Sequence, residues 1–212
     1  MIVHSKTINI AFYYLVFMKG DKRERIIRIL IDNPDSSLTA YRLHIKAECS
    51  EQWTGSYLKK LEKMNLIKDT RVVNIYGLFE HWLRIRSPLE FAEYHIQKDP
   101  LTIIKNSNLS YALTTYQADN LIHNYLFPTR TDIYVLKDEL NQWHNTLLSH
   151  GLVGAGNTRI IIADPHIIKT AIKQGGFFIV SKPQLISDLF MEGGVAVDAA
   201  NLLVRKWYSE FI

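Results

Sequence analysis

The chain has 212 residues, of which 47% are hydrophobic and 22% charged. This composition is ordinary for a globular protein and excludes a largely disordered or fibrous chain. The 25 Lys and Arg residues exceed the 21 Asp and Glu residues by four, and the whole excess lies in the first half. Residues 1–100 hold 16 basic and 12 acidic residues, whereas residues 101–212 hold nine of each. This asymmetry favours an anion-binding first half and an electrically neutral second half.

Cysteine content and hydropathy exclude further classes of protein. Cys49 is the only cysteine, so neither an intrachain disulfide nor a cysteine-based zinc motif can form. The longest apolar run, residues 8–18, has 11 residues, well short of the roughly 20 that a membrane-spanning helix needs. The basic stretch KGDKRER follows it where a signal peptide would have a cleavage site. We therefore expect a cytoplasmic protein with no membrane partner, in which residues 8–18 pack on another surface, such as a second copy of the chain.

Three short helices are predicted in the first part of the chain. The first is predicted at residues 21–32, which place Ile26, Ile27, Leu30 and Ile31 on one helical stripe and charged residues elsewhere. A second helix is predicted at residues 38–48, with Thr39 as its N-cap. The third is predicted at residues 51–64, with Ser50 as its N-cap and leucines at three-residue spacing on its buried face.

Three helices in this order, followed by extended residues, are the parts of a winged helix-turn-helix. The stretch WTGSYLKKLEKMNLI, residues 53–67, resembles the third helix and first wing strand of prokaryotic winged-helix regulators. Asn65 stands where those regulators usually have Gly, and Asn tolerates the left-handed conformation that ends a helix. A full wing needs a second strand, but a new helix is predicted after Asn74, with one apolar side made by Leu78, Phe79, Trp82 and Leu83. We therefore expect a stunted wing.

The third predicted helix has a polar face that suits contact with DNA. Gln52, Ser56, Lys59 and Lys63 recur at steps of four, three and four residues and so share one side of the helix. Gln can read adenine, Ser can reach a base edge or a phosphate, and Lys neutralises phosphate. A solvated helix face with no ligand is the alternative interpretation. With flanking polar and basic positions included, the predicted DNA-binding residues are Thr39, Arg42, Ser50, Gln52, Thr54, Ser56, Lys59, Lys60, Lys63, Lys68 and Arg71.

The second half alternates predicted strands and helices. We place the boundary in the proline-bearing and polar stretch 87–108, which gives domains of residues 1–100 and 101–212. Helices are predicted at residues 112–125, 139–149 and 183–207, and strands at residues 132–136, 159–163 and 177–180. Ser181 is the expected cap of the last helical segment, which EGG interrupts. The predicted class is α+β, a winged helix-turn-helix followed by an α/β domain.

The stretch RTDIYVL, residues 130–136, is a candidate catalytic segment. Nucleotidyltransferases hold two divalent metal ions on carboxylates spaced i and i+2 along a strand, because that spacing puts both on one face. Here Asp132 is followed at the second position by Tyr134, and the upstream LTTYQA lacks the glycine of a Gly-Ser turn. We therefore expect no catalysis, no metal and no cofactor, with Asp132 making local hydrogen bonds at a strand end. The glycines of residues 151–157 follow a helix and precede a strand, the reverse of a dinucleotide fingerprint, so we interpret them as a flexible connector.

The end of the chain carries a second resemblance. VSKPQLISDLFMEGGVAVDAANLLVRKW, residues 180–207, together with ALTTYQADNLI and TDIYV, resembles the C-terminal domain of AbiEi-type antitoxins of type IV toxin–antitoxin systems. The matching positions are Val180, Ser181, Pro183, Gln184, Leu185, Asp188, Gly193, Gly194, Ala199 and Ala200, with one extra residue between Ser181 and Pro183.

The resemblance implies a degenerate nucleotidyltransferase fold and a regulator that binds its own operator in double-stranded DNA. It also implies that the protein opposes a nucleotidyltransferase-type toxin without a stable complex between them. Whether the chain forms a homodimer stays open. Two alternatives remain: a divergent nucleotidyltransferase enzyme, and a ligand-sensing regulator whose C-terminal domain binds a small molecule.

Overall fold

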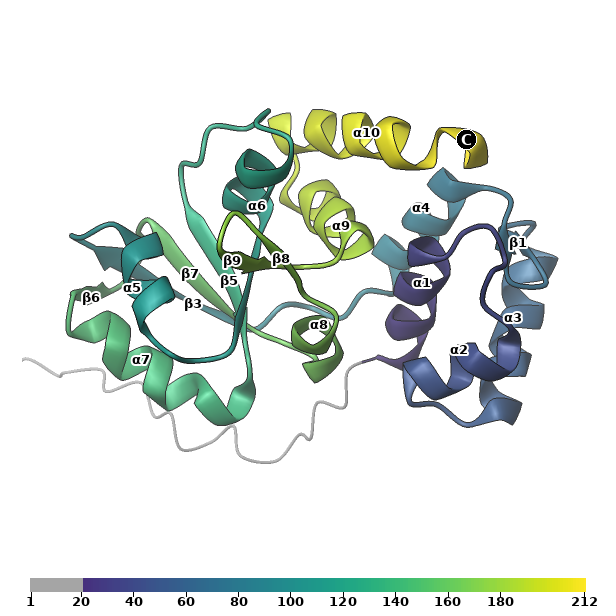
Figure 1. Cartoon of the computed structure of the whole chain (residues 1–212), viewed down its shortest axis with the longest axis horizontal. Helices are drawn as coiled ribbons and strands as arrows, with labels where there is room; N and C mark the ends of the chain where they lie inside the picture. The colour runs from purple at the N-terminus through teal and green to yellow at the C-terminus, as the bar shows by residue number, and fades with distance from the viewer. Residues whose placement is uncertain (1–20) are drawn as a thin grey trace, which may run out of the picture.

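The computed structural model describes residues 21–212 as two packed parts, a cluster of helices and a mixed sheet covered by further helices (Figure 1). The apolar run at residues 8–18, and the surface it was expected to pack on, lie outside the described residues. Within residues 21–212, no helix combines the length and the apolar character that crossing a bilayer requires.

The helical cluster is built from the first part of the described chain. Its members are α1 (Lys22–Asp32), α2 (Ala40–Ala47), α3 (Glu51–Lys63) and α4 (Ile75–Ile85). Each begins at a residue whose side chain accepts a hydrogen bond from a first-turn backbone N–H, namely Asp21, Thr39, Ser50 and Asn74. Such a cap satisfies a donor that the helix itself leaves open. The caps predicted at Thr39 and Ser50 are confirmed.

A small hairpin follows α3. It consists of β1 (Ile67–Lys68) and β2 (Arg71–Val72), an antiparallel pair of two residues each. Asn65 ends α3 in the left-handed conformation, with φ of 54°, as the sequence predicted. Helix α4 then begins almost at once, with Leu78, Phe79 and Trp82 buried. The hairpin is short, but it contains a second strand, β2, that was not predicted from the sequence.

The second part is a seven-stranded mixed sheet in the order β6-β3-β7-β5-β4-β9-β8. Pairs β5/β7 and β4/β9 are parallel, and the remaining pairs are antiparallel. The strands are β3 (Phe91–Ile96), β4 (Tyr111–Thr114), β5 (Thr131–Val135), β6 (Gly151–Val153), β7 (Thr158–Ile162), β8 (Ile172–Gln174) and β9 (Phe177–Ile179). The helices are α5 (Pro100–Asn106), α6 (Thr115–Ile122), α7 (Leu140–Leu148), α8 (Pro165–Lys169), α9 (Lys182–Glu192) and α10 (Val195–Tyr208).

Strand β3 changes the expected domain boundary. It lies before residue 100, yet it pairs with β6 on one side and β7 on the other. A division at residue 100 would therefore take a strand out of the interior of the sheet. Pro88 and Pro100, which suggested a linker, lie just outside the two ends of β3, where proline removes no ladder hydrogen bond.

Two further expectations differ from the structure, each for its own reason. Tyr111–Thr114 form β4 instead of the start of a helix, because all four residues are buried in the middle of the sheet and show no alternation that would identify a strand. The connector expected at residues 151–157 is shorter than predicted, since residues 151–153 form β6 and only residues 154–157 link it to β7. A Cβ atom at Gly151 would lie 2.1 Å from the carbonyl oxygen of His95, so close approach of two strands requires glycine there.

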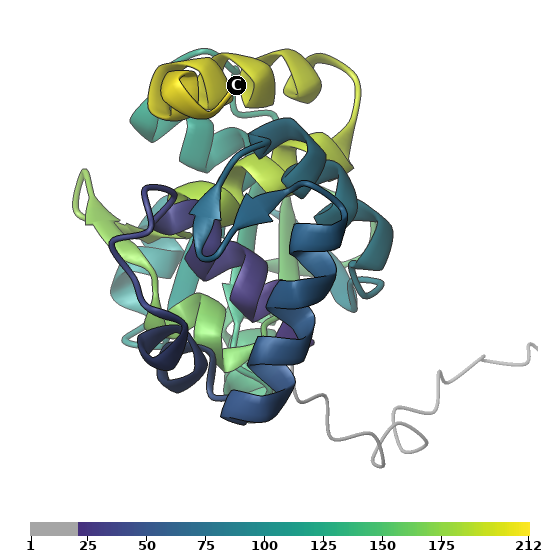
Figure 2. The same ribbon diagram turned by 90° about the vertical axis from the view of Figure 1, so that its right-hand side faces the viewer.

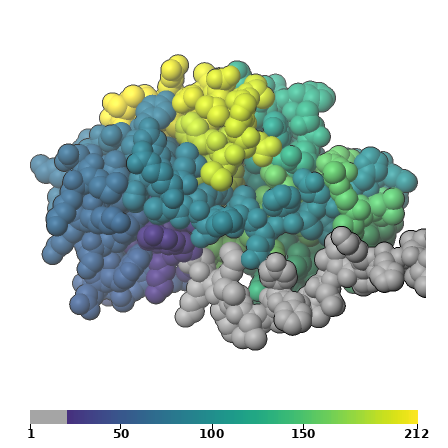
Figure 3. Space-filling view, turned by 180° about the vertical axis from the view of Figure 1, so that it is seen from behind, coloured from purple at the N-terminus to yellow at the C-terminus, as the bar shows by residue number. Residues whose placement is uncertain are grey.

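Helix α9 joins the two parts by packing on α1 and α4 as well as on α6 (Figure 1). From behind, the yellow-green C-terminal segment lies between the blue helical cluster and the teal and green second part (Figure 3). Arg86, just after α4, forms an ion pair with Asp188 of α9, and both side chains are at most 3% exposed. The same guanidinium donates to Ser187 Oγ at 2.9 Å and to Tyr134 Oη at 2.8 Å. Burial disfavours the charged form of Arg86, but Asp188 outweighs this effect and raises the pKa of Arg86 above its ordinary value.

We expect Arg86→Leu to lower the free energy of unfolding by about 4 kcal/mol, because it leaves the Asp188 carboxylate buried without its cation. Arg84→Leu is the matched control, since Arg84 lies two residues earlier in an exposed pair with Glu80 and should cost less than about 1 kcal/mol. Urea denaturation followed by circular dichroism measures both. Equal effects of the two substitutions, or separate unfolding transitions for the two parts of the wild-type chain, would contradict this account of the junction.

Candidate functional site

The polar face predicted on α3 is open to solvent. Gln52, Ser56, Lys59 and Lys63 are all exposed, whereas Tyr57, Leu58 and Leu61 are buried on the opposite side. Figure 2 shows α3 along the outer face of the helical cluster, with no other element in front of it. The helix thus presents amide, hydroxyl and ammonium groups along one continuous line.

Nearly all the other predicted DNA-binding residues are also exposed. They are Thr39 and Arg42 at the start of α2, Ser50 and Lys60 on α3 and its cap, and Lys68 and Arg71 in the hairpin. Within residues 21–212, none of the lysines of this set has a carboxylate within 4.0 Å of its ammonium group. These charges are available to an external anion.

Thr54 is the exception among the predicted residues. Its side chain is buried, and its hydroxyl oxygen has no hydrogen-bond partner within the described part of the chain. It faces the inside of the cluster because it lies two positions from Gln52, and residues two apart on a helix point in different directions. Thr54 therefore cannot contact DNA from this position.

Buried contacts hold α3 in place. Tyr57 Oη lies 3.1 Å from His81 Nε2 on α4, and the Trp53 ring stacks on the Tyr57 ring with centroids 5.5 Å apart. Burial raises the pKa of Tyr57 and lowers the pKa of His81, so both groups are neutral near pH 7 and the contact is an uncharged hydrogen bond. The exposed face of α3 is therefore fixed relative to α4.

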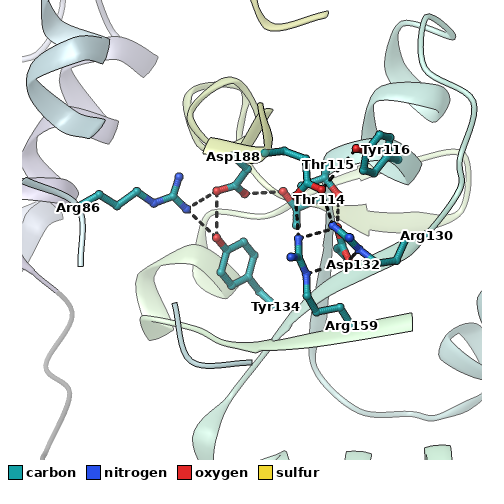
Figure 4. Close-up of polar contacts among 10 residues, drawn as sticks. Arg86, Thr114, Thr115, Tyr116, Arg130, Asp132, Tyr134, Arg159 and Asp188 are labelled. Carbon is teal, nitrogen blue, oxygen red and sulfur yellow. Dashed lines mark hydrogen bonds and ion pairs between the residues drawn. The ribbon is translucent and has the colours of Figure 1, made fainter. Parts of the chain in front are cut away.

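A second candidate site surrounds Asp132 at the start of β5 (Figure 4). The Asp132 side chain is fully buried and forms ion pairs with Arg130 at 2.6 Å and with Arg159 of β7 at 3.0 Å. The Thr115 hydroxyl also donates to it. Both guanidiniums extend further to Glu192 at the end of α9, at 2.8 and 3.0 Å. Two arginines and two carboxylates thus form one closed cluster.

The residue at the second position of the suspected metal motif has another partner. The Tyr134 hydroxyl donates to Asp188 at 3.0 Å, and burial, followed by the nearby Asp188 charge, raises the pKa of Tyr134. Asp188 also accepts hydrogen bonds from Gln184 and Thr114, in addition to its ion pair with Arg86. Among the described residues, no group of three or more His, Cys, Asp and Glu side chains is arranged to hold a metal ion.

The geometry corrects the expected role of Asp132. Asp132 contacts Arg159 on β7, and its two arginine partners contact Glu192 at the end of α9, so the network extends well beyond the local hydrogen bonds that were expected. Sequence reasoning missed Arg159, Asp188 and Glu192. One available signal was the four-residue spacing of Gln184, Asp188 and Glu192, which places three polar side chains on one face of an otherwise apolar helix.

We expect titration with Mg²⁺ or Mn²⁺ to show no tight binding, because the guanidiniums of Arg130 and Arg159 already occupy both carboxylate oxygens of Asp132. Asp132→Asn should lower the free energy of unfolding by about 3 kcal/mol, since it removes the central anion of a buried cluster. Asp138→Asn, an exposed position, is the control. Calorimetry and urea denaturation provide the measurements. Metal-dependent nucleotide incorporation that Asp132→Asn abolishes would instead identify an enzyme.

Comparison with known proteins identifies no family and no function for this chain. The chain matches no protein-family model, no curated protein and no solved structure.

Proposed function

We propose that the protein is a DNA-binding transcriptional regulator that docks α3 in the major groove of duplex DNA. The observation that carries this proposal is the exposed line of Gln52, Ser56, Lys59 and Lys63 on a helix that buried contacts hold rigidly. A solvated surface helix would need no such alignment, whereas groove recognition needs donors and acceptors on one fixed face.

Each exposed group has a role that fits its chemistry. The Gln52 amide suits bidentate contact with adenine, and the Ser56 hydroxyl suits a base edge or a phosphate. Without DNA, the Ser56 hydroxyl donates to the backbone carbonyl oxygen of Gln52 at 3.0 Å. Exchanging this bond within the helix for a hydrogen bond to DNA costs little free energy. Lys59 and Lys63 neutralise phosphates, and Lys68 in the hairpin extends the basic line beyond α3.

The resemblance of residues 180–207 to AbiEi-type antitoxins supports a more specific role. In this role the protein autoregulates its operon and opposes a nucleotidyltransferase-type toxin without a stable complex. The second part then acts without catalysis, in agreement with a cluster whose carboxylates are all engaged by arginines or hydroxyls. The gene beside this one is the first test, because the proposal requires it to encode such a toxin.

We expect the affinity for duplex operator DNA to fall as salt rises, because each neutralised phosphate releases a counterion. Lys59→Ala and Lys63→Ala should each reduce the log–log salt slope by about 0.9 per lost phosphate contact. Gln52→Ala should instead reduce discrimination between operator variants by about 1 to 3 kcal/mol. Fluorescence anisotropy over a range of salt concentrations measures both effects. Lys105→Ala, an exposed lysine on α5, is the control, and a slope unchanged in Lys59→Ala and Lys63→Ala would remove α3 from the interface.

The two proposed activities should be separable by substitution. We expect the full-length double variant Lys59→Ala/Lys63→Ala to lose operator binding while still protecting cells that express the toxin. Point variants are preferred to fragments, because β3 and the Arg86–Asp188 pair tie the two parts together. Gel-shift and co-expression assays provide the readouts. Loss of protection together with loss of DNA binding would show that protection acts only through repression.

A further inference from the structure

We propose that the cleft between the helical cluster and the sheet binds a small organic anion that carries a planar ring. The cleft has a volume of about 670 Å³, within the range of sites that hold drug-sized ligands. The proposal does not depend on DNA binding, since it is tested by direct binding of small molecules, although Trp53 of α3 lies in the cleft lining.

The cleft lies where α/β proteins commonly bind ligands. Its lining includes Tyr134 near the end of β5 and Ile162 at the end of β7. These two strands are parallel, and the crevice outside the carboxyl ends of parallel strands is the usual ligand position in open α/β sheets. Arg28 of α1 and Trp53 of α3 also line the cleft, so residues from both parts border one space.

Arg28 is a buried cation without a matching anion. The residue is 2% exposed and borders the cleft. Its Nε donates to Gln184 Oε1 at 2.9 Å, and its Nη1 lies 2.9 Å from His166 Nδ1. Within residues 21–212, no carboxylate lies within 4.0 Å of this guanidinium. Buried charges are normally paired because removing them from water is costly.

Burial lowers the pKa of Arg28 and outweighs the charges of Asp164 and Glu24, which lie beyond contact distance and favour the charged form. A cation–π contact with the Trp82 ring, 5.6 Å from the Arg28 Cζ atom to the ring centroid, also favours the charged form. Arg28 can only donate, so His166 Nδ1 must accept, and the His166 ring is neutral at pH 7 because burial, followed by the nearby Arg28 charge, lowers its pKa to about 4. Asp164 is engaged by Arg25, with two contacts of 2.6 and 2.7 Å. The carboxylate of Glu24 accepts from Trp82 Nε1 at 2.9 Å and from the Ser87 backbone at 3.1 Å. An anion entering the cleft would complete the coordination of Arg28.

The other walls favour an aromatic group. Trp53 is 36% exposed, and its stacking on Tyr57 holds the indole in a fixed orientation at the cleft wall. Pro88, Leu89 and Ile167 add apolar surface. A planar ring on such a platform gains stacking energy and desolvates the neighbouring charge pair, which strengthens the contact with Arg28. Phosphate and carboxylate anions share this chemistry.

The test measures binding of four probes to the full chain by calorimetry and thermal shift. Adenosine 5′-monophosphate and indole-3-acetate combine ring and anion, whereas adenosine has only the ring and inorganic phosphate only the anion. We expect at least one ring-bearing anion to bind at least tenfold more tightly than adenosine and phosphate. At a concentration about 100 times its Kd, it should raise Tm by about 5 °C. Which of the two binds distinguishes a phosphate ligand from a carboxylate ligand.

Substitutions then locate the bound probe. Arg28→Met should weaken binding by about 30-fold or more, because it removes the buried charge that the anion pairs with. Arg84→Met is the matched control, since Arg84 is exposed and lies outside the cleft. If Arg28 only links structural elements, Arg28→Met should lower the Tm of the ligand-free protein. If Arg28 is a cation that pairs with a bound anion, Arg28→Met should leave the Tm of the ligand-free protein unchanged or raise it.

Trp53→Ala provides an independent check, because a partly exposed side chain can be removed without unfolding the protein. We expect it to weaken binding of the ring-bearing probe by about tenfold and to leave any phosphate binding unchanged. Failure of both ring-bearing probes to bind would overturn the proposal. Binding that is unaffected by Arg28→Met and by Trp53→Ala would place the site elsewhere and would overturn it equally. Neither result would alter the salt dependence of DNA binding, so the two proposals fail separately.

Discussion

The buried ion pair between Arg86 and Asp188 is the constraint on which the arrangement of the molecule depends. It lies where the segment after α4, the strand β5 and the helix α9 meet, and Tyr134 bonds to both partners. Apolar packing alone tolerates small rotations between helices, whereas a buried charge pair with directional hydrogen bonds tolerates few. The position of the helical cluster on the sheet, and with it the shape of the cleft, follows from this junction.

Arginine and lysine have different positions in this fold. Arginines such as Arg25, Arg86 and Arg159 form buried or half-buried ion pairs, in which a planar guanidinium matches the geometry of a carboxylate. The lysines along α3 are exposed, and within residues 21–212 none of them has a carboxylate partner. A modest net charge can therefore still produce a local basic surface, because carboxylates neutralise Arg25, Arg86 and Arg159 whereas, within residues 21–212, no carboxylate pairs with the lysines of α3.

The sequence was sufficient to predict the helical cluster in detail, because its helices carry amphipathic patterns and side-chain caps. Thr39, Ser50 and Asn65 mark helix ends through local chemistry that a single sequence displays. The sheet was harder to predict. Residues 111–114 are buried on both faces of β4 and show no alternation, so only their neighbours in space identify them as a strand.

The candidate sites show the same contrast. The exposed face of α3 follows from residue spacing. Thr54 was wrongly included among the DNA-contacting residues, because its side chain is buried although Gln52 and Ser56 on either side of it are exposed. The cluster around Asp132 joins residues from three distant segments. The unmatched charge of Arg28 is visible only once its surroundings are known, since a sequence reports the presence of an arginine and not the absence of its anion.

The closed cluster of Asp132, Glu192, Arg130 and Arg159 also limits how the sequence can change by single substitutions without a loss of stability. A metal centre at Asp132 would require the loss of both guanidiniums and a carboxylate in place of Tyr134. Replacing either arginine alone leaves Asp132 and Glu192 sharing one cation, and each such intermediate is less stable than the starting protein. Each single substitution therefore lowers stability before any metal affinity is gained, and this non-additivity separates the cluster from metal-binding sequences.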